Sequence, residues 1–284
     1  MSLELEKDLI TGFSVAPEEP SLFATQQLVD LSPGREINFE LSAQRWCVGF
    51  DEPAGTVGPC PDQALAKGGD RCERCADRTR LLPCLRCIGD RCGNPARRAN
   101  CVFSDHYVYL ACYGTDLFKV GVTRIERFQR RILEQGALGA IAIAAAGGQE
   151  VRRIEYAISR AGWPDRVNML PLLNQEPVDQ EQAEELLRLQ ARRIIQRLPE
   201  ERIVSDGPFV YVADHYPVVD GMTPRTLDPE NDPLAGKILG IRGGWLLLQA
   251  GQETVAVSLR NLNGREIKAR ESSVVGPAQG AFAF

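Results

Sequence analysis

The hydrophobic pattern is clearest in the middle of the chain, over residues 106–155. Two apolar runs, 107–112 and 118–122, are separated by a short turn and together predict a β-hairpin. A helix is predicted to begin at Thr123, because Thr123 and Glu126 have the spacing of a capping box. Its apolar stripe consists of Ile125, Phe128 and Ile132.

A third strand and a second helix complete this region. Apolar residues 138–145 predict the strand, a Gly-Gly pair ends it, and the helix then runs to Arg160. The carboxylate of Glu155 is drawn toward the core, because it lies close to the apolar stripe of this helix. That stripe consists of Val151, Ile154 and Ile158.

The flanking segments have shorter patterns. Apolar and polar residues alternate at the start of 37–46, which predicts a strand. Apolar residues with helical spacing predict a helix over 178–198, which Asp179 can cap. After Ile203, short β-rich runs alternate with Gly, Asn, Asp and Pro, a pattern typical of a small antiparallel barrel or sandwich.

These patterns predict an α+β chain of several modules, because 284 residues exceed one small core. The central module is expected to be a three-stranded sheet with flanking helices. The expected division is an N-terminal β segment at 1–46, a cysteine-rich zinc-binding module at 47–104, the central module at 105–175, a bridging helix at 176–200 and a C-terminal β-rich module at 201–284.

The composition is that of an ordinary globular protein, with 44% hydrophobic and 25% charged residues. No apolar run is long enough to span a bilayer, so no membrane segment is expected. Residues 1–20 are acidic and lack an apolar signal region, so a cytoplasmic location is expected rather than secretion.

The net charge of −5 argues against a general nucleic-acid binder, but the charge is uneven. Residues 71–131 contain thirteen Lys and Arg and six Asp and Glu, a local charge of +7, which leaves −12 for the rest of the chain. A basic segment in an acidic chain favours an anionic ligand, most commonly phosphate. A solvated basic face balanced by acidic neighbours is the alternative.

Nine cysteines need an explanation, because disulfides rarely persist in a reducing compartment. Two C-x-x-C pairs, 72–75 and 84–87, can each present two thiolates to one tetrahedral ion. The chain has two histidines, so a structural metal site must consist almost entirely of thiolates. Cys112, on a predicted strand, is left as a core residue. Two zinc sites of four thiolates each, in a grouping that the sequence does not assign, account for Cys47, Cys60, Cys72, Cys75, Cys84, Cys87, Cys92 and Cys101.

The cysteine pattern leaves three alternatives to structural zinc. An iron–sulfur cluster is possible, although the cysteine spacing matches neither common ferredoxin pattern. A redox role for a C-x-x-C pair lacks the βαβ setting that it needs. Unligated buried cysteines are disfavoured, because the segment has few large apolar residues and would hardly fold without a metal.

Polar residues at particular places on the apolar central frame form a candidate catalytic site. A cationic set with a single inward carboxylate suits phosphate chemistry. The candidate catalytic residues are Tyr109, Lys119, Arg131 and Glu155. The candidate phosphate-binding residues are Arg124, Arg127 and Arg130.

Residues 106–155 resemble the GIY-YIG nuclease superfamily. The matching positions, in chain order, are Val108-Tyr109, Lys119-Val120-Gly121 followed by Thr123, Arg131-Ile132 and Ile154-Glu155. Arg127 and Arg130 are alternatives in register for the helix arginine. The chain departs from the pattern at Lys119, where the superfamily's second Tyr is expected, although some branches carry a Lys there. No Gly precedes the first motif.

The resemblance implies metal-dependent hydrolysis of a phosphodiester in DNA or RNA. Tyr109 would then activate water as general base, and Glu155 would hold one Mg2+ or Mn2+. Arg131 would stabilise charge on the phosphoryl oxygens, and Lys119 would orient the phosphate. Most of the chain also resembles an uncharacterised bacterial family that joins a cysteine cluster, a GIY-YIG-like core and a β-rich end.

Two other functions are kept open by the sequence. The Arg-rich zinc region could bind nucleic acid without cutting it, or the core could act on a phosphate-bearing small molecule or nucleotide. Arg131 and Glu155 could also form a buried ion pair that serves only stability. The sequence carries no prediction of the oligomeric state.

Overall fold

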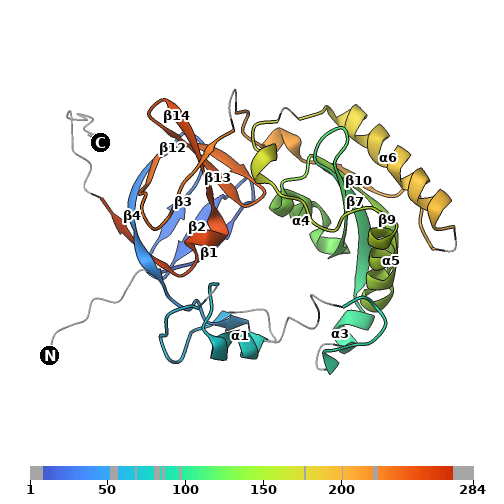
Figure 1. Ribbon diagram of the computed structural model, residues 1–284, viewed down its shortest axis with the longest axis horizontal. Helices are drawn as coiled ribbons and strands as arrows, with labels where there is room; N and C mark the ends of the chain where they lie inside the picture. The colour runs from blue at the N-terminus through green and yellow to red at the C-terminus, as the bar shows by residue number, and fades with distance from the viewer. Residues whose placement is uncertain are drawn as a thin grey trace, which may run out of the picture.

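The computed structural model describes residues 9–51, 57–67, 69–79, 84, 87–95, 98–175, 177–199, 201–219 and 223–270. The ends of the predicted terminal modules, at 1–8 and 271–284, lie outside the described residues. The chain is a mixed α+β protein, as predicted. Figure 1 shows a β-rich part beside a central sheet with its helices, and a cysteine-rich segment that lies next to both.

The central sheet, here called the core sheet, has four antiparallel strands in the order β10-β9-β7-β8. The strands are β7 (Asp105–Cys112), β8 (Phe118–Arg124), β9 (Gly139–Gly147) and β10 (Phe209–Tyr211). The prediction of three strands was therefore one short. Val210 of β10 pairs with Ala140 of β9, and this pairing covers backbone groups that would otherwise form a sheet edge.

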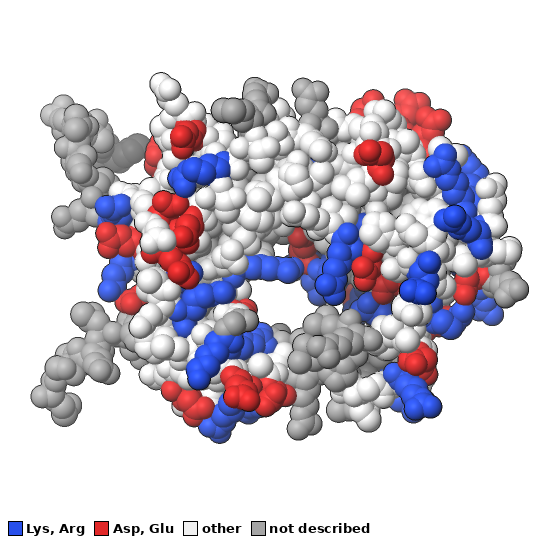
Figure 2. Space-filling model, viewed as in Figure 1, with Lys and Arg blue, Asp and Glu red and all other residues white. Residues whose placement is uncertain are grey.

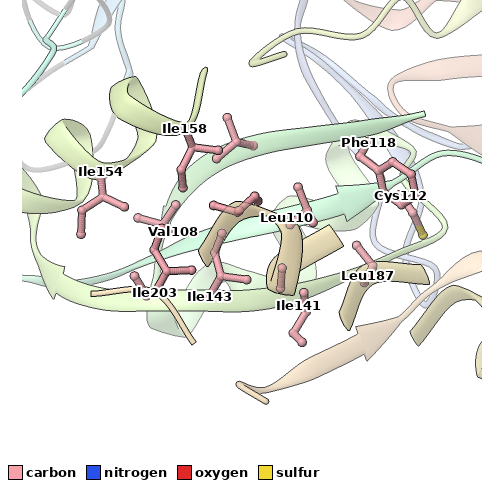
Figure 3. Packing of buried hydrophobic residues seen from close by; sticks show 14 of the residues in the cluster. Val108, Leu110, Cys112, Phe118, Ile141, Ile143, Ile154, Ile158, Leu187 and Ile203 are labelled. Atoms are coloured by element: carbon pink, nitrogen blue, oxygen red, sulfur yellow. The ribbon is translucent and has the colours of Figure 1, made fainter. Parts of the chain in front are cut away.

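Helices cover both faces of the core sheet. They are α4 (Phe128–Gln135), α5 (Gly148–Arg160) and α6 (Gln180–Arg197). Alternate residues of β7 face opposite ways, so Val108 and Leu110 pack with α5 and α6, as Figure 3 shows, whereas Tyr109 packs with α4. Two short 3-10 turns, η3 (Leu170–Leu172) and η4 (Ala213–His215), lie among the connections.

The predicted helix start at Thr123 is wrong. Thr123 is buried within β8, where it pairs with Tyr107, and a 3-10 turn, η2 (Ile125–Arg127), precedes α4. Continued hairpin pairing therefore prevails over the local capping pattern. The cap predicted for the long helix is present, because the Asp179 carboxylate accepts a hydrogen bond of 2.8 Å from the backbone N–H of Gln182.

The β-rich part is built from both ends of the chain. Its six-stranded sheet, here called the β-rich sheet, has the order β11-β14-β13-β12-β4-β15. The strands are β4 (Glu36–Arg45), β11 (Arg225–Thr226), β12 (Leu234–Arg242), β13 (Trp245–Ala250), β14 (Glu253–Ser258) and β15 (Arg265–Ala269). The N-terminal strand β4 thus completes a sheet made otherwise of C-terminal strands, with the short helix α7 (Leu259–Leu262) between β14 and β15.

A smaller three-stranded sheet packs on the β-rich sheet. It consists of β1 (Ile10–Ser14), β2 (Ser21–Ala24) and β3 (Leu28–Asp30). Ile10 and Leu22 are fully buried in the same apolar cluster as Leu246 and Leu248 of β13. The burial of these apolar side chains is the main source of stability for the β-rich part.

Arg242, at the end of β12, joins the β-rich sheet to the core. Its side chain is only 2% exposed and donates hydrogen bonds to the backbone carbonyls of Gly136, Leu172 and Gln175. A buried guanidinium requires such partners. The two parts of the chain therefore share a specific polar junction.

The cysteine-rich segment, residues 47–101, has only short elements among the residues that the structure describes. Its described elements are β5 (Phe50–Asp51), β6 (Val57–Gly58), α1 (Glu73–Thr79) and, at its end, α3 (Arg98–Val102). Within the part of the chain that the structure describes, no helix is long and apolar enough to cross a membrane.

Candidate functional site

Four cysteines form a candidate metal centre. The Sγ atoms of Cys47, Cys60, Cys72 and Cys75 all lie within 4.8 Å of one another. The Sγ atoms of Cys60 and Cys72 are 3.9 Å apart, close to the roughly 3.8 Å that a tetrahedral ion with Zn–S bonds of about 2.3 Å imposes. The geometry and the thiol chemistry of this set both fit a zinc ion.

Three chain segments build this centre. Cys47 follows β4, Cys60 follows β6, and Cys72 and Cys75 flank the start of α1. Backbone hydrogen bonds fix the first segment, for the N–H of Cys47 donates to the carbonyl of Ala64 at 2.9 Å. The apolar cluster around the four cysteines is small, so backbone hydrogen bonds of this kind help to hold the segments in position around a metal.

The thiols of the centre differ in how readily they ionise. Burial raises the pKa of Cys75, and the neighbouring thiols of Cys47, Cys72 and Cys60 raise it further. Burial also opposes ionisation of Cys60, but hydrogen bonds from the backbone of Ala64 and Asp62 and from the thiols of Cys47 and Cys75 together outweigh it and lower the pKa of Cys60 to about 7. Four thiolates this close need a bound cation to be stable together.

The other four predicted zinc ligands lie in a looser group. Asn94 connects two of them, because its side-chain Nδ2 donates to Sγ of Cys84 at 3.5 Å and its backbone carbonyl accepts from Sγ of Cys92 at 3.3 Å. Burial raises the pKa of Cys101, and the charges of Cys87, Cys84 and Cys92 raise it further. Cys112, in contrast, is fully buried in β7.

A second polar site lies on the face of the core sheet that α4 covers. The Oε1 atom of Gln135, at the end of α4, accepts hydrogen bonds from Tyr109 Oη at 2.9 Å and from Lys119 Nζ at 3.0 Å. Tyr113 Oη lies 3.4 Å from the same oxygen. One neutral amide therefore gathers two residues predicted from the sequence and one that was not.

Gly121 makes room for the Tyr109 ring. The two residues are paired across β7 and β8, and a Cβ added at Gly121 would lie 2.5 Å from Cζ of Tyr109. Phe128 fixes the other side of the ring, with ring centroids 6.0 Å apart. Tyr109 is 1% exposed as a result, and burial raises its pKa although Arg131 opposes the shift.

Lys119 is the ionisable residue at the centre of the site. Burial lowers its pKa to about 8, and the positive charge of Arg131 contributes in the same direction. The carboxylates of Glu155 and Asp165 act against this shift, which places both acids within electrostatic range of Lys119. The charged form of Lys119 is therefore destabilised unless an anion approaches.

Glu155 belongs to α5, which covers the opposite face of the core sheet but also contacts the edge strand β8. Its carboxylate is 2.7 Å from the guanidinium of Arg152. Burial raises the pKa of Glu155, and Arg152 opposes that shift. The side chain of Glu155 is 16% exposed, which leaves it accessible at the edge of the sheet.

The arginines at the start of α4 and in the turn before it are partly neutralised. Glu134 contacts Arg127 of η2 at 3.0 Å, and Arg130 and Arg131 of α4 at 3.2 Å and 3.4 Å. The alternative ion pair between Arg131 and Glu155 is not formed. Arg124, at the end of β8, lies 3.7 Å from Glu126.

Two members of the site were missed in the sequence analysis. Gln135 lies four residues after Arg131 and so falls on the same side of α4, and Arg152 lies three residues before Glu155. The helical spacing was available as a signal. An amide carries no charge, however, and only the folded hairpin shows that Tyr109 and Lys119 converge on it.

One family of sequences matches this chain, over residues 34–267, and its members are described as "protein of unknown function (DUF2797)". Comparison with curated proteins and with solved structures gave no match. The matched range contains both the cysteine centre and the Gln135 site. The predicted resemblance of most of the chain to an uncharacterised family is confirmed to this extent.

Proposed function

The chain belongs to this family of proteins of unknown function, DUF2797, and from its own residues we propose that it hydrolyses phosphodiester bonds in DNA or RNA. The proposal includes the GIY-YIG resemblance of residues 106–155. It rests on one observation above all: Tyr109 and Lys119 converge on a single oxygen, beside Arg131 and within electrostatic range of Glu155.

The roles of these residues follow from their chemistry. Lys119 and Arg131 attract and orient a phosphate, because both are cations and burial makes an uncompensated charge on Lys119 unfavourable. Tyr109 takes the proton of the attacking water in its phenolate form, after it has lost to solvent the proton that it donates to Gln135. The water oxygen then bonds to phosphorus as the bond to the leaving oxygen breaks, and the leaving oxygen takes up a proton from solvent.

Glu155 is proposed to bind a divalent cation. Mg2+ commonly binds proteins through one or two carboxylates and completes its shell with water and substrate phosphate, so a single accessible carboxylate fits. Such an ion, Mg2+ or Mn2+, would supply charge neutralisation at the phosphate. The 2.7 Å ion pair with Arg152 holds the Glu155 carboxylate in place.

Two structural zinc ions are part of the proposal. The first belongs to the centre of Cys47, Cys60, Cys72 and Cys75. We assign the second to the group of Cys84, Cys87, Cys92 and Cys101, supported by the electrostatic proximity of these four thiols. A Cβ at Gly148, the first residue of α5, would collide with Sγ of Cys101, so this group contacts the helix that carries Glu155.

A nicking assay tests the proposal. Purified protein with Mg2+ or Mn2+ is expected to cleave plasmid DNA or a labelled RNA, and Glu155→Gln is expected to lose this activity. The matched control is Glu185→Gln, which removes an exposed carboxylate from α6 and should cleave normally. Equal cleavage by Glu155→Gln and the wild type would remove Glu155 from the mechanism.

The ion pair between Arg152 and Glu155 also supports a second candidate, a zinc-dependent protein that binds nucleic acid without cutting it. A carboxylate already paired at 2.7 Å is less available to a metal ion. This candidate predicts salt-sensitive binding with no cleavage product in any divalent cation.

A further inference from the structure

The short helix α7 of the β-rich part lies at the junction with the core. The N–H of Leu259, its first residue, donates to the carbonyl of Gly244 at 2.9 Å. The adjacent Gly243 touches the end of α4, because a Cβ added at Gly243 would lie 2.9 Å from the carbonyl oxygen of Gln135. Arg260 therefore follows a residue, Leu259, that is hydrogen-bonded to the turn at Gly243 and Gly244. That turn contacts Gln135, whose side chain accepts the hydrogen bond of Lys119.

The charge of Arg260 reaches the candidate site. Burial is the main cause of the lowered pKa of Lys119, and Arg260 is one of the positive charges that lower it further, together with Arg131. Arg260 is exposed, and no described carboxylate lies within ion-pair distance of it. Its guanidinium is thus available to an external anion.

Hydrogen bonds to the backbone of α7 hold Arg260 in position. Arg45, the last residue of β4, donates from its guanidinium to the carbonyls of Arg260 and Asn263, each at 3.1 Å. Burial lowers the pKa of Arg45, and the nearby Arg265 lowers it further. Two further cations, Arg45 and Arg265, therefore lie near α7, and the carboxylates of Asp70 and Glu230 partly balance them.

Figure 2 shows an opening in the middle of this face, with Lys, Arg, Asp and Glu side chains along the described part of its border. Lys119 of the core sheet and Arg260 of α7 lie within electrostatic range of each other. Their mutual repulsion is unfavourable, and a chain of phosphates would relieve it by contacting both cations. A single small anion at Lys119 would not need a cation from the second sheet.

We propose that Arg260 binds the nucleic-acid backbone at a phosphate next to the one held by Lys119 and Arg131, so that a strand crosses from the core to the β-rich part. This inference deepens the proposed function and rests on it for the identity of the ligand. It assigns the β-rich part a direct role in substrate binding, with Arg45 as the residue that positions α7.

Fluorescence anisotropy tests the inference on the full-length protein. The probes are short fluorescein-labelled oligonucleotides of one sequence, as single-stranded DNA, single-stranded RNA and duplex DNA, with Ca2+ in place of Mg2+. Arg260→Gln is compared with Lys237→Gln, which removes one positive charge from an exposed residue of β12 in the same sheet. Circular dichroism and zinc content confirm that both variants are folded.

Arg260→Gln is expected to weaken binding about fivefold and to reduce the slope of log K against log salt concentration by about 0.7 to 0.9. Lys237→Gln is expected to match the wild type. Equal affinity of the two variants overturns the inference and leaves the hydrolysis proposal intact. Binding that depends on Arg260 without any cleavage overturns hydrolysis and leaves the inference intact, and no binding by the wild type overturns both.

Discussion

The side chain of Lys119 donates a hydrogen bond of 3.0 Å to the amide oxygen of Gln135, which also accepts one of 2.9 Å from Tyr109. The hydrogen-bond partner of Lys119 is thus a neutral amide, which does not compensate the charge of the ammonium as a carboxylate would. The arrangement keeps the ammonium oriented but incompletely compensated. An anion, such as the phosphate proposed above, would stabilise this charge.

Replacing Gln135 tests whether this amide organises the site. Gln135→Leu removes the acceptor of three part-buried donors, so we expect a loss of about 1–3 kcal/mol in the free energy of unfolding, measured by urea denaturation. Gln129→Leu is the control, because Gln129 is exposed on the same helix. Equal stability of the two variants would show that the hydrogen bonds of Gln135 contribute nothing.

Gly121 is predicted to be replaceable only when Tyr109 is changed as well. Gly121→Ala places a methyl group 2.5 Å from Cζ of Tyr109 and should cost about 1–3 kcal/mol of stability. In the background of Tyr109→Ala the same change should cost much less, because the ring is gone. A double-mutant cycle measures this coupling, and strictly additive costs would contradict it.

The lowered pKa of Lys119 predicts a dependence of stability on pH. The pKa falls from 10.5 to about 8 on folding, chiefly through burial, so between these values the unfolded chain binds more protons than the folded one. Stability contributed by this residue therefore rises as pH increases from about 8 to 10.5.

Lys119→Met lacks this titration and supplies the comparison. The difference in free energy of unfolding between wild type and Lys119→Met should shift in favour of the wild type across that window. Urea denaturation of both proteins at several pH values measures it, and effects of other titrating groups cancel in the difference. A constant difference would mean that Lys119 keeps its ordinary pKa.

The sequence predicted the local elements of the core better than its long-range pairings. The hairpin of β7 and β8 and the helices α5 and α6 follow from periodicity over neighbouring residues. The pairing of β10 with β9, and of β4 with β12 and β15, joins segments far apart in sequence, and no local pattern specifies such partners.

The same distinction applies to the sites. The spacing of the cysteines predicted a thiolate site, and the fold supplied the grouping of Cys47 and Cys60 with the pair at 72–75. The charged residues of the second site were visible as motifs. Gln135 was not, because its importance arises only where two strands and a helix end meet.

The zinc assignment predicts a specific loss of metal. The wild type should contain two zinc ions per chain by elemental analysis, and Cys75→Ser should lose one of them with a lower melting temperature. Cys112→Ser is the control, since Cys112 is buried in the core sheet away from the centre and should retain both ions. Iron in the purified protein, or unchanged zinc in Cys75→Ser, would contradict the assignment.

The single-turnover rate of phosphodiester cleavage in Mn2+ decides whether Glu155 takes part in hydrolysis. Wild type and Glu155→Gln are compared on the same labelled oligonucleotide at saturating protein, so that differences in binding do not affect the rate. The proposal predicts a Mn2+-dependent rate for the wild type and a loss of at least about a hundredfold in Glu155→Gln. Cleavage at the same rate by both proteins, or none by either while the oligonucleotide is bound, would contradict it.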